Sequence, residues 1–355
     1  MESRSHDIPK NSDCSIFLLT VPVPLPSMGH PIFWLVFLAH SFQNSVKDEF
    51  GAVNHLIGAR LNSNVDLVVN VGDHIVNAGG KRLRPLVVIL SAMANDYRGK
   101  NHIIAAAVIE FIHTATLLHD DVVDGSSLRR GRYTANSQWG NASSVLVGDF
   151  LYSRAFQMLV EIGNISVMSS IANASNLISE GEVQQLSYVG NPDVDESMYL
   201  EVIYKKTAVL YEASATIGAM LADCQTKAMA DYGRHLGLAF QITDDILDYR
   251  GEVDILGKNI GSDLKDGKMT LPLIYAQGSV SASERAVIRD VVINRQNERL
   301  VEVRELVKSS GGLEYSLEVA RKQVLLAQEA LSLLPKNVYT DDLIDLAEFS
   351  VDRVL

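Results

Sequence analysis

The distribution of proline is the feature that most constrains how this 355-residue chain can fold. After residue 44, proline occurs only at Pro85, Pro192, Pro272 and Pro335. Because proline interrupts helix interiors, this spacing leaves long intervals in which helices can continue unbroken. Those intervals are rich in alanine, leucine, isoleucine and glutamate, which favour helix. The sequence therefore predicts an all-α fold built as a single large helical bundle.

The hydrophobic pattern supports the same fold class. Segments such as IIAAAVIEFIHTATLLHDD are apolar around most of the helical wheel, as buried helices are. Two β-branched runs, LVVNV and LVVIL, have the composition of strands, but neither alternates in polarity or adjoins a hairpin turn, so we interpret both as helix. Glycine, proline, asparagine and aspartate predict loops. The predicted loops span residues 78–80, 97–101, 125–140, 190–193 and 250–267.

The first 44 residues differ from the rest of the chain. Their apolar stretch carries Pro22, Pro24, Pro26 and Pro31, which divide it into runs much shorter than the about 20 residues that a spanning helix needs. The start also lacks the net positive charge of a signal peptide. We interpret residues 1–44 as an extension that is disordered, touches a membrane or reflects a start site placed too far upstream. Residues 45–355 are the predicted helical domain.

Charge and cysteine content restrict the function. The net charge of −12 argues against a nucleic-acid surface, which needs a basic stripe. Lysines and arginines nevertheless gather in three short segments, 81–84, 129–132 and 258–268, which indicates small anionic ligands. Two cysteines exclude a disulfide framework and a thiolate zinc site. We expect a cytoplasmic protein, with membrane association as an alternative.

A repeated acidic motif indicates a metal site. Asp120, Asp121 and Asp124 stand at i, i+1 and i+4, so on a helix they would lie on one face. The same spacing returns at residues 244, 245 and 248, in FQITDDILDY. Clustered carboxylates without cysteine or paired histidine suit Mg²⁺, which is usually shared with substrate phosphates. A single acidic run could be a solvated helix end, but its repetition makes that interpretation much weaker.

Basic and polar residues around these motifs are candidate phosphate ligands. The segment AGGKRLRP offers Lys81 and Arg84 on one face of a helix that Pro85 helps to start. Arg129 and Arg130 follow the first acidic motif and could bind phosphate or merely neutralise carboxylates. His113 lies two turns before the motif on nearly the same face, where an ordinary buried histidine is the simpler interpretation.

Further candidates lie in the second half of the chain. Lys206 and Thr207 sit within an apolar helix, where lysine is costly unless it meets an anion. Gln241 precedes Asp244 by one helical turn and could orient a ligand. Lys258 and Lys268 belong to a glycine-rich segment, residues 251–268, which suits a lid over phosphates.

Five motifs taken together resemble one family. GGKRLRP, HTATLLHDDVVDGSSLRRG, KKTA, FQITDDILDY and GKNIGSDLKDGK occur in this order, and the chain is similar to the trans-type polyprenyl diphosphate synthases over roughly residues 45–350. Residues 125–127 are Gly-Ser-Ser where the nearest relatives carry acidic residues. The resemblance implies an isoprenoid-synthase bundle around a deep central cavity, usually a homodimer. The implied reaction condenses an allylic diphosphate such as farnesyl diphosphate with successive isopentenyl diphosphates, for quinone side chains.

The resemblance also implies residue roles. Mg²⁺ would be held by Asp120, Asp124 and Asp244, assisted by Asp121, Asp245 and Asp248. Isopentenyl diphosphate would meet Lys81, Arg84, His113 and Arg130, which overturns the simpler interpretation of His113. The allylic diphosphate would meet Arg129, Lys206, Thr207, Gln241 and Lys258.

Product length is predicted from the residues below the first acidic motif. Thr116 lies one turn beneath Asp120 on the same face, whereas Ala115 is well off it. The family nevertheless assigns length control to both positions, with bulky aromatic residues there in short-chain enzymes. Because both residues are small here, we expect a long product, of eight isoprene units, delivered to a membrane.

Two alternatives remain open from the sequence. A class I terpene cyclase shares an aspartate-rich motif and a helical fold, but its second metal motif normally has a different composition from DDILD. A non-catalytic subunit of a heteromeric synthase would generally have lost acidic motifs, and both are intact here.

Overall fold

The computed structural model describes residues 43–76, 80–224, 226–250 and 261–353. Residues 41–355 form one unit, distinct from residues 1–40. The predicted extension, residues 1–44, thus lies almost wholly outside the described residues and stays a prediction. Within the described ranges the unit is all-α, as predicted, and its only strands are β1 (Leu128–Arg129) and β2 (Arg132–Tyr133), which pair antiparallel.

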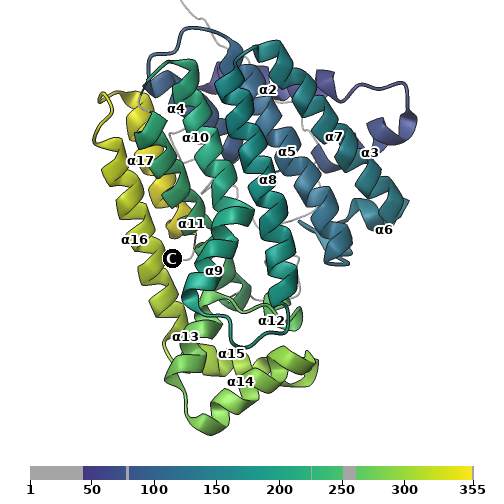
Figure 1. The fold of residues 1–355 in the computed structure, drawn as a ribbon, viewed down its shortest axis with the longest axis vertical. Coiled ribbons are helices and arrows are strands. Elements are labelled where there is room, and N and C mark those ends of the chain that lie inside the picture. The colour runs from purple at the N-terminus through teal and green to yellow at the C-terminus, as the bar shows by residue number, and fades with distance from the viewer. Residues whose placement is uncertain (1–42, 77–79, 225, 251–260, 354–355) are drawn as a thin grey trace, which may run out of the picture. The chain divides into compact units, whose positions relative to one another are not determined.

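The helices follow one another along the chain with mostly short connections (Figure 1). A π-helical turn, Tyr204–Ala208, joins α9 to α10, and a 3₁₀ turn, Asn297–Arg299, precedes α15. The α-helices are α2 (Lys47–Arg60), α3 (Asp66–Val76), α4 (Leu83–Ala94), α5 (Asn101–Val123), α6 (Ala135–Trp139), α7 (Asn141–Ile162), α8 (Ile165–Tyr188), α9 (Glu196–Ile203), α10 (Val209–Leu221), α11 (Thr226–Arg250), α12 (Ser262–Lys265), α13 (Leu271–Ser279), α14 (Ala282–Asn294), α15 (Leu300–Ser309), α16 (Gly312–Leu331) and α17 (Val338–Asp352).

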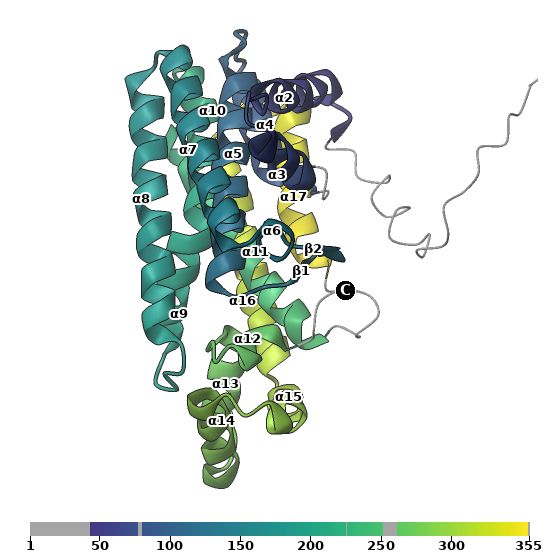
Figure 2. The ribbon, with the colours of Figure 1, turned by 90° about the vertical axis from the view of Figure 1, so that its right-hand side faces the viewer.

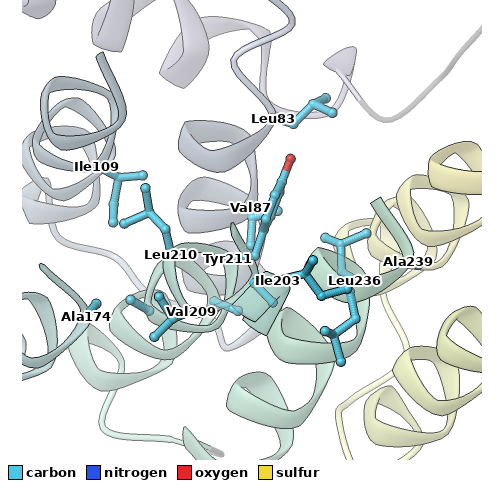
Figure 3. Packing of buried hydrophobic residues seen from close by; sticks show 14 of the residues in the cluster. Leu83, Val87, Ile109, Ala174, Ile203, Val209, Leu210, Tyr211, Leu236 and Ala239 are labelled. Atoms are coloured by element: carbon cyan, nitrogen blue, oxygen red, sulfur yellow. The ribbon is translucent and has the colours of Figure 1, made fainter. Parts of the chain in front are cut away.

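The core lies among α4, α5, α10 and α11. Helix α5 packs against α7, α4 and α2, whereas α10 packs against α11, α4 and α8, and α16 covers α11 (Figures 1 and 2). Figure 3 shows Val87, Ile109, Tyr211 and Leu236 converging from the four core helices. Because each of these helices has neighbours on several sides, its side chains are apolar around most of the wheel. This arrangement sets the ends of α5 and α11 in place, where the acidic motifs occur.

Both β-branched runs are helical, as predicted, in α3 and α4. In α4 the run Leu86–Leu90 is fully buried. Its β-branched, apolar composition therefore reflects burial on all sides of a helix and does not indicate a β-strand. The turn at residues 190–193 is confirmed. The loop prediction for residues 125–140 was wrong in part, because this segment holds the β1–β2 hairpin and α6. Most of the predicted loop at residues 250–267 lies outside the described residues. Its last part contains the short helix α12.

Helix α5 is the one helix in the described ranges that is long and apolar enough to span a membrane by length and composition. Of the most apolar 18-residue stretch of this helix, 61% is buried inside the protein. The helix packs there against α4, α7 and α2. Its apolar surface therefore serves as core.

Helices α4 and α10 approach closely at Gly218. A methyl group at this position would lie 2.6 Å from Ser91 Cβ and 2.7 Å from the Val88 carbonyl oxygen. The Ser91 hydroxyl donates a hydrogen bond to the Ala215 carbonyl oxygen across the same contact, at 2.6 Å. The α4–α10 distance thus depends on the absence of a side chain at residue 218.

We predict that Gly218→Ala destabilises the protein by about 1–3 kcal/mol, because the added methyl group must push two helices apart. The matched control is Gly58→Ala in α2, where a methyl group meets nothing within 4 Å. That change should stabilise the protein by about 0.5–1 kcal/mol through helix propensity. Urea unfolding followed by circular dichroism measures both, and equal effects would contradict the close contact.

Candidate active site

The first acidic motif lies where α5 ends. Asp124 is the C-cap of α5, and Asp121 is 2% exposed beneath it. Arg129 donates from Nε and Nη2 to Oδ1 of Asp121, at 3.0 and 2.8 Å. Asp121 is therefore the buried member of the three and is already engaged by Arg129, which the helical spacing did not predict. Its carboxylate turns inward because the β1–β2 hairpin brings Arg129 back against it.

The carboxylate of Asp120 has no hydrogen-bond partner in the described part of the chain. Burial raises the pKa of its carboxyl to about 7, opposed by Lys206 and Arg129 and reinforced by Glu182 and Asp124. An ionised carboxylate that is buried in this way is unfavourable by itself, and a bound cation stabilises its charged form. Asp120 is thus poised to accept a metal ion or a proton.

The second acidic motif lies in the last turns of α11. Asp245 is 4% exposed and accepts hydrogen bonds from the Tyr199 hydroxyl at 2.7 Å and from Gln241 Nε2 at 2.8 Å. Burial raises the pKa of its carboxyl well above the ordinary value. Asp248 accepts from the backbone N–H groups of Ser262 and Asp263 at 3.2 and 3.1 Å. Both side chains therefore satisfy groups of the protein itself.

Asp244 points to the C-terminal end of the described chain. Arg353 donates from Nη1 to its Oδ1 at 2.9 Å and lies 3.8 Å above the ring of Phe240. The pKa of Lys81 is lowered to about 8 by burial and by Arg353, with Asp244 acting in the opposite direction. Asp244, Arg353 and Lys81 thus form one electrostatic group.

Lys268 connects the two acidic motifs. Its Nζ is 3.4 Å from Asp124 Oδ1 of the first motif. Its backbone N–H donates to the Asp263 carbonyl oxygen at 2.8 Å, and Asp263 in turn donates to Asp248 of the second motif. Burial lowers the pKa of Lys268, but Asp263, Asp124 and Asp266 together raise it above the ordinary value. Lys268 thus connects the two motifs, with its ammonium group at the end of α5 and its backbone bonded to the residue that binds Asp248 of α11.

A π-helical turn carries the central lysine and threonine. Lys206 donates to Glu182 at 2.8 Å, and the Thr207 hydroxyl donates to Gln241 Oε1 at 2.8 Å. The turn is wider than an α-helix and fits between two glycines. A methyl group at Gly181 would lie 2.9 Å from Lys206 N, and one at Gly237 would lie 2.5 Å from Ala208 Cα. Gln241 thus links this turn to Asp245, a contact that the sequence did not predict.

A second cationic group lies between α4, α5 and the hairpin. Arg84 stacks 4.3 Å above the Tyr211 ring, and its Nη1 is 3.3 Å from His113 Nε2. Burial lowers the pKa of His113 well below its usual value, and Arg84, Arg130 and Arg129 lower it further. The imidazole is therefore neutral at pH 7. Lys81 precedes α4, so the prediction that Lys81 and Arg84 share a helix face was wrong.

Several site residues gave no signal in the sequence. Arg353 is a lone cation near the end of the chain, and Tyr199 and Glu182 belong to helices without a motif. Glu110 precedes His113 by one turn and resembles any core-flanking glutamate. Each gains its place only through tertiary packing. Lys258, in contrast, was predicted as a ligand but lies outside the described residues.

The positions predicted to set product length lie on α5 below Asp120. Ala115 is fully buried. Thr116 is partly buried, and its hydroxyl donates to the His113 carbonyl oxygen at 2.7 Å. Neither side chain is large, as the sequence already indicates.

The six motif aspartates divide into two sets by their partners. Asp121 and Asp245 are buried, and they and Asp248 are each held by at least two hydrogen bonds from the protein. The Asp120 carboxylate has no hydrogen-bond partner among the described residues, and Asp124 and Asp244 each meet one cation, Lys268 or Arg353, with side chains 28% and 44% exposed. In the described ranges no group of three or more acidic, histidine or cysteine residues stands ready-made for a metal ion. Hard oxygen donors that a divalent cation can share with a phosphate nevertheless fit the second set.

Comparison with known proteins gives a consistent result. Residues 65–309 match the polyprenyl synthetase family model. The octaprenyl diphosphate synthase of Haemophilus influenzae is 46% identical over 305 residues, which cover 85% of this chain and 93% of that protein. The all-trans-nonaprenyl-diphosphate synthase of Rhodobacter capsulatus is 42% identical, covering 87% and 96%.

Solved structures agree with the sequence matches. A polyprenyl synthase of Caulobacter crescentus, complexed with calcium and isoprenyl diphosphate, superposes with a TM-score of 0.86 at 41% identity, covering 88% of this chain and 97% of that one. A decaprenyl diphosphate synthase of Rhodobacter capsulatus gives a TM-score of 0.84 at 42% identity, covering 88% and 98%. The chain belongs to the polyprenyl synthetase family and is a prenyltransferase.

Proposed function

We propose that this chain is a long-chain trans-polyprenyl diphosphate synthase that extends farnesyl diphosphate with isopentenyl diphosphate to eight isoprene units. One observation carries the proposal: Lys268 contacts Asp124 of the first aspartate motif, its backbone is linked through Asp263 to Asp248 of the second, and the first motif is followed by Arg129 and Arg130. Two cationic groups suit two diphosphates. The high identity to octaprenyl diphosphate synthases supports the product length and a role in quinone side-chain synthesis.

The allylic diphosphate is assigned to the side of Asp120 and Lys206. Asp120, Asp124 and Asp244 would hold Mg²⁺ there, and bound Mg²⁺ supplies charge neutralisation to the departing diphosphate. Lys206, Arg129, Thr207 and Gln241 would orient that diphosphate, with Lys258 and Lys268 added from the 251–268 segment. Asp121, Asp245 and Asp248 act by holding the surrounding helix ends, since their oxygens are already engaged.

Isopentenyl diphosphate is assigned to Lys81, Arg84, His113 and Arg130. Guanidinium groups match phosphate oxygens in a bidentate way, and Arg84 Nε is buried without a hydrogen-bond partner among the described residues. His113 lies beside Arg84 and would offer a ring N–H to the diphosphate. Binding here presents the isopentenyl double bond to the allylic carbon from which diphosphate departs. Exclusion of water by the apolar core protects the allylic cation.

The reaction class is tested by mass spectrometry of products from the purified chain, Mg²⁺, farnesyl diphosphate and isopentenyl diphosphate. We expect polyprenyl diphosphates with eight isoprene units as the main product. Hydrocarbons would instead indicate a terpene cyclase. Inactivity of the chain alone, restored by a partner, would indicate a non-catalytic subunit.

The division of the aspartates gives a sharper prediction. Asp120→Asn should lower kcat by about a hundredfold or more, because metal ligation is worth several kcal/mol, without lowering the melting temperature. Asp248→Asn should instead lower the unfolding free energy by about 0.5–2 kcal/mol, since it weakens a helix N-terminal cap. Asp73→Asn, exposed on α3, is the control for both. Equal activity losses with equal melting temperatures for Asp120→Asn and Asp248→Asn would contradict this division.

Product length provides a separate prediction. Ala115→Tyr and Thr116→Phe each place an aromatic ring below the first acidic motif and should shorten the main product by several isoprene units. Thr116→Val keeps the volume, loses the hydrogen bond to His113 and should leave product length unchanged. Thin-layer or liquid chromatography of dephosphorylated products measures all three. An eight-unit product from both aromatic variants would contradict a chain-length path along α5.

A homodimer is the expected assembly. Leu146, Phe156 and Val160 form an exposed apolar stripe on α7, and Val183 and Leu186 do so on the adjoining α8 (Figure 1). Several exposed large apolar side chains on two consecutive helices are typical of a protein interface. A second copy of the chain would bury it.

The dimer surface is tested by one charged substitution with a matched control. Val160→Glu on α7, where the side chain is 67% exposed, should convert dimer to monomer in sedimentation experiments. Val301→Glu on α15, where it is 69% exposed, should leave the assembly unchanged. A Val160→Glu variant that sediments as the unmodified protein does would contradict the assignment.

A further inference from the structure

Arg82 lies between the two candidate ligands Lys81 and Arg84, yet its side chain is engaged elsewhere. Its Nη1 donates a hydrogen bond to Asn54 Oδ1 on α2. Its Nε is 3.8 Å from Glu110 Oε1 on α5. The side chains of Arg82 and Glu110 are only 18% and 14% exposed. The middle cation of GGKRLRP therefore points into the protein, between α2 and α5.

The backbone of Arg82 is left-handed, with φ 46° and ψ 43°, at the N-cap of α4. A residue with a Cβ in this conformation costs about 1–2 kcal/mol and persists only where its surroundings hold it. Asn54 and Glu110 supply that restraint from two different helices. The turn and its anchors are consequently one structural unit.

The same turn decides where the neighbouring cations go. Lys81, before the turn, lies 4.4 Å above the Phe349 ring on α17. Arg84, in the first turn of α4, stacks on Tyr211 and contacts His113. A right-handed residue at position 82 would redirect Lys81 while α4 kept Arg84 in place. The separation between these two cations thus follows from the conformation of Arg82.

The carboxylate of Glu110 offsets the positive charge of the arginines around this turn. Glu110 lies one turn before His113 on α5, and its carboxylate is attracted by Arg82, Arg84 and Arg130, whereas burial raises its pKa. Arg130 also packs against the turn, since a methyl group at Gly80 would lie 2.8 Å from its Nη1. A buried carboxylate beneath three guanidinium groups does not bind a diphosphate. It restrains the groups that do.

We propose that Asn54, Arg82 and Glu110 form a strap of positioning residues that fixes the left-handed turn before α4 and thereby the separation of Lys81 and Arg84. The proposal rests on the proposed function, because it takes those two cations as ligands of isopentenyl diphosphate. None of the three strap residues touches substrate. Their loss should therefore weaken isopentenyl diphosphate binding selectively, while the allylic site on the side of Asp120 keeps its affinity.

Arg82→Gly is the decisive variant, because glycine adopts the left-handed turn without strain but lacks the tether. We expect its KM for isopentenyl diphosphate to rise about tenfold, which corresponds to about 1.4 kcal/mol, with the KM for farnesyl diphosphate unchanged. Arg98→Gly, at an exposed arginine paired with Asp96, is the matched control and should change neither value. An unchanged isopentenyl KM in Arg82→Gly, or equal rises for both substrates, would overturn the proposal.

A second pair of variants keeps the test valid if Arg82→Gly folds poorly. Asn54→Ala removes one anchor and should raise the isopentenyl KM, whereas Asn54→Asp keeps an acceptor for Arg82 and should restore it. Equal KM values in this pair would also overturn the strap. Calorimetric titration of each variant with isopentenyl diphosphate needs no turnover. Absence of prenyl transfer in the unmodified chain, with binding still weakened in Arg82→Gly, would refute the proposed function and leave the strap standing.

Discussion

The cost of removing charge from water governs this structure. The ends of α5 and α11 bring six aspartates and several lysines and arginines into a region bordered by an apolar core, where unpaired charge is expensive. The protein meets that cost most completely for three of the aspartates, each of which accepts at least two hydrogen bonds. Arg129 satisfies Asp121, Tyr199 and Gln241 satisfy Asp245, and the N-terminus of α12 satisfies Asp248. Of the remaining three, Asp124 and Asp244 each meet a single side-chain cation, Lys268 or Arg353, and Asp120 meets none by hydrogen bond in the described ranges.

This division explains how one motif serves two purposes. Within each DDxxD run, one or two carboxylates fix the local chain, and the others face the junction. The β1–β2 hairpin, the N-terminus of α12 and the Tyr199 hydroxyl each supply a hydrogen-bond donor to one of these carboxylates, as buried acids require. The candidate metal ligands are thereby held on rigid helix ends, because the aspartates that fix each helix end belong to the same short motif as the aspartates that face the junction. The π-turn between Gly181 and Gly237 follows the same logic, presenting Lys206 from a shape that its neighbours enforce.

Much of the fold was predictable because it depends on local rules. Proline spacing and helical composition predicted the bundle. The absence of alternating polarity in LVVIL correctly predicted that this run is helical, in α4. What failed depends on tertiary context. The inward turn of Asp121 required knowledge of the hairpin, the position of Lys81 outside α4 required the left-handed Arg82, and the π-turn leaves no mark in YKKTA. Arg353 and Glu110 enter the site only because α17 and α5 pack beside α4, a contact that no spacing encodes.

The central claim is that Asp120, Asp124 and Asp244 bind divalent metal, with Asp124 and Asp244 exchanging Lys268 and Arg353 for it, whereas the other three keep their partners in the protein. A crystal structure with Mg²⁺ and a non-ionisable allylic thiodiphosphate tests this most directly. The account predicts Mg²⁺ at about 2.0–2.1 Å from oxygens of those three residues, with Asp121, Asp245 and Asp248 keeping their present partners. Metal bound instead by Asp121, Asp245 or Asp248, with their hydrogen bonds broken, would contradict it.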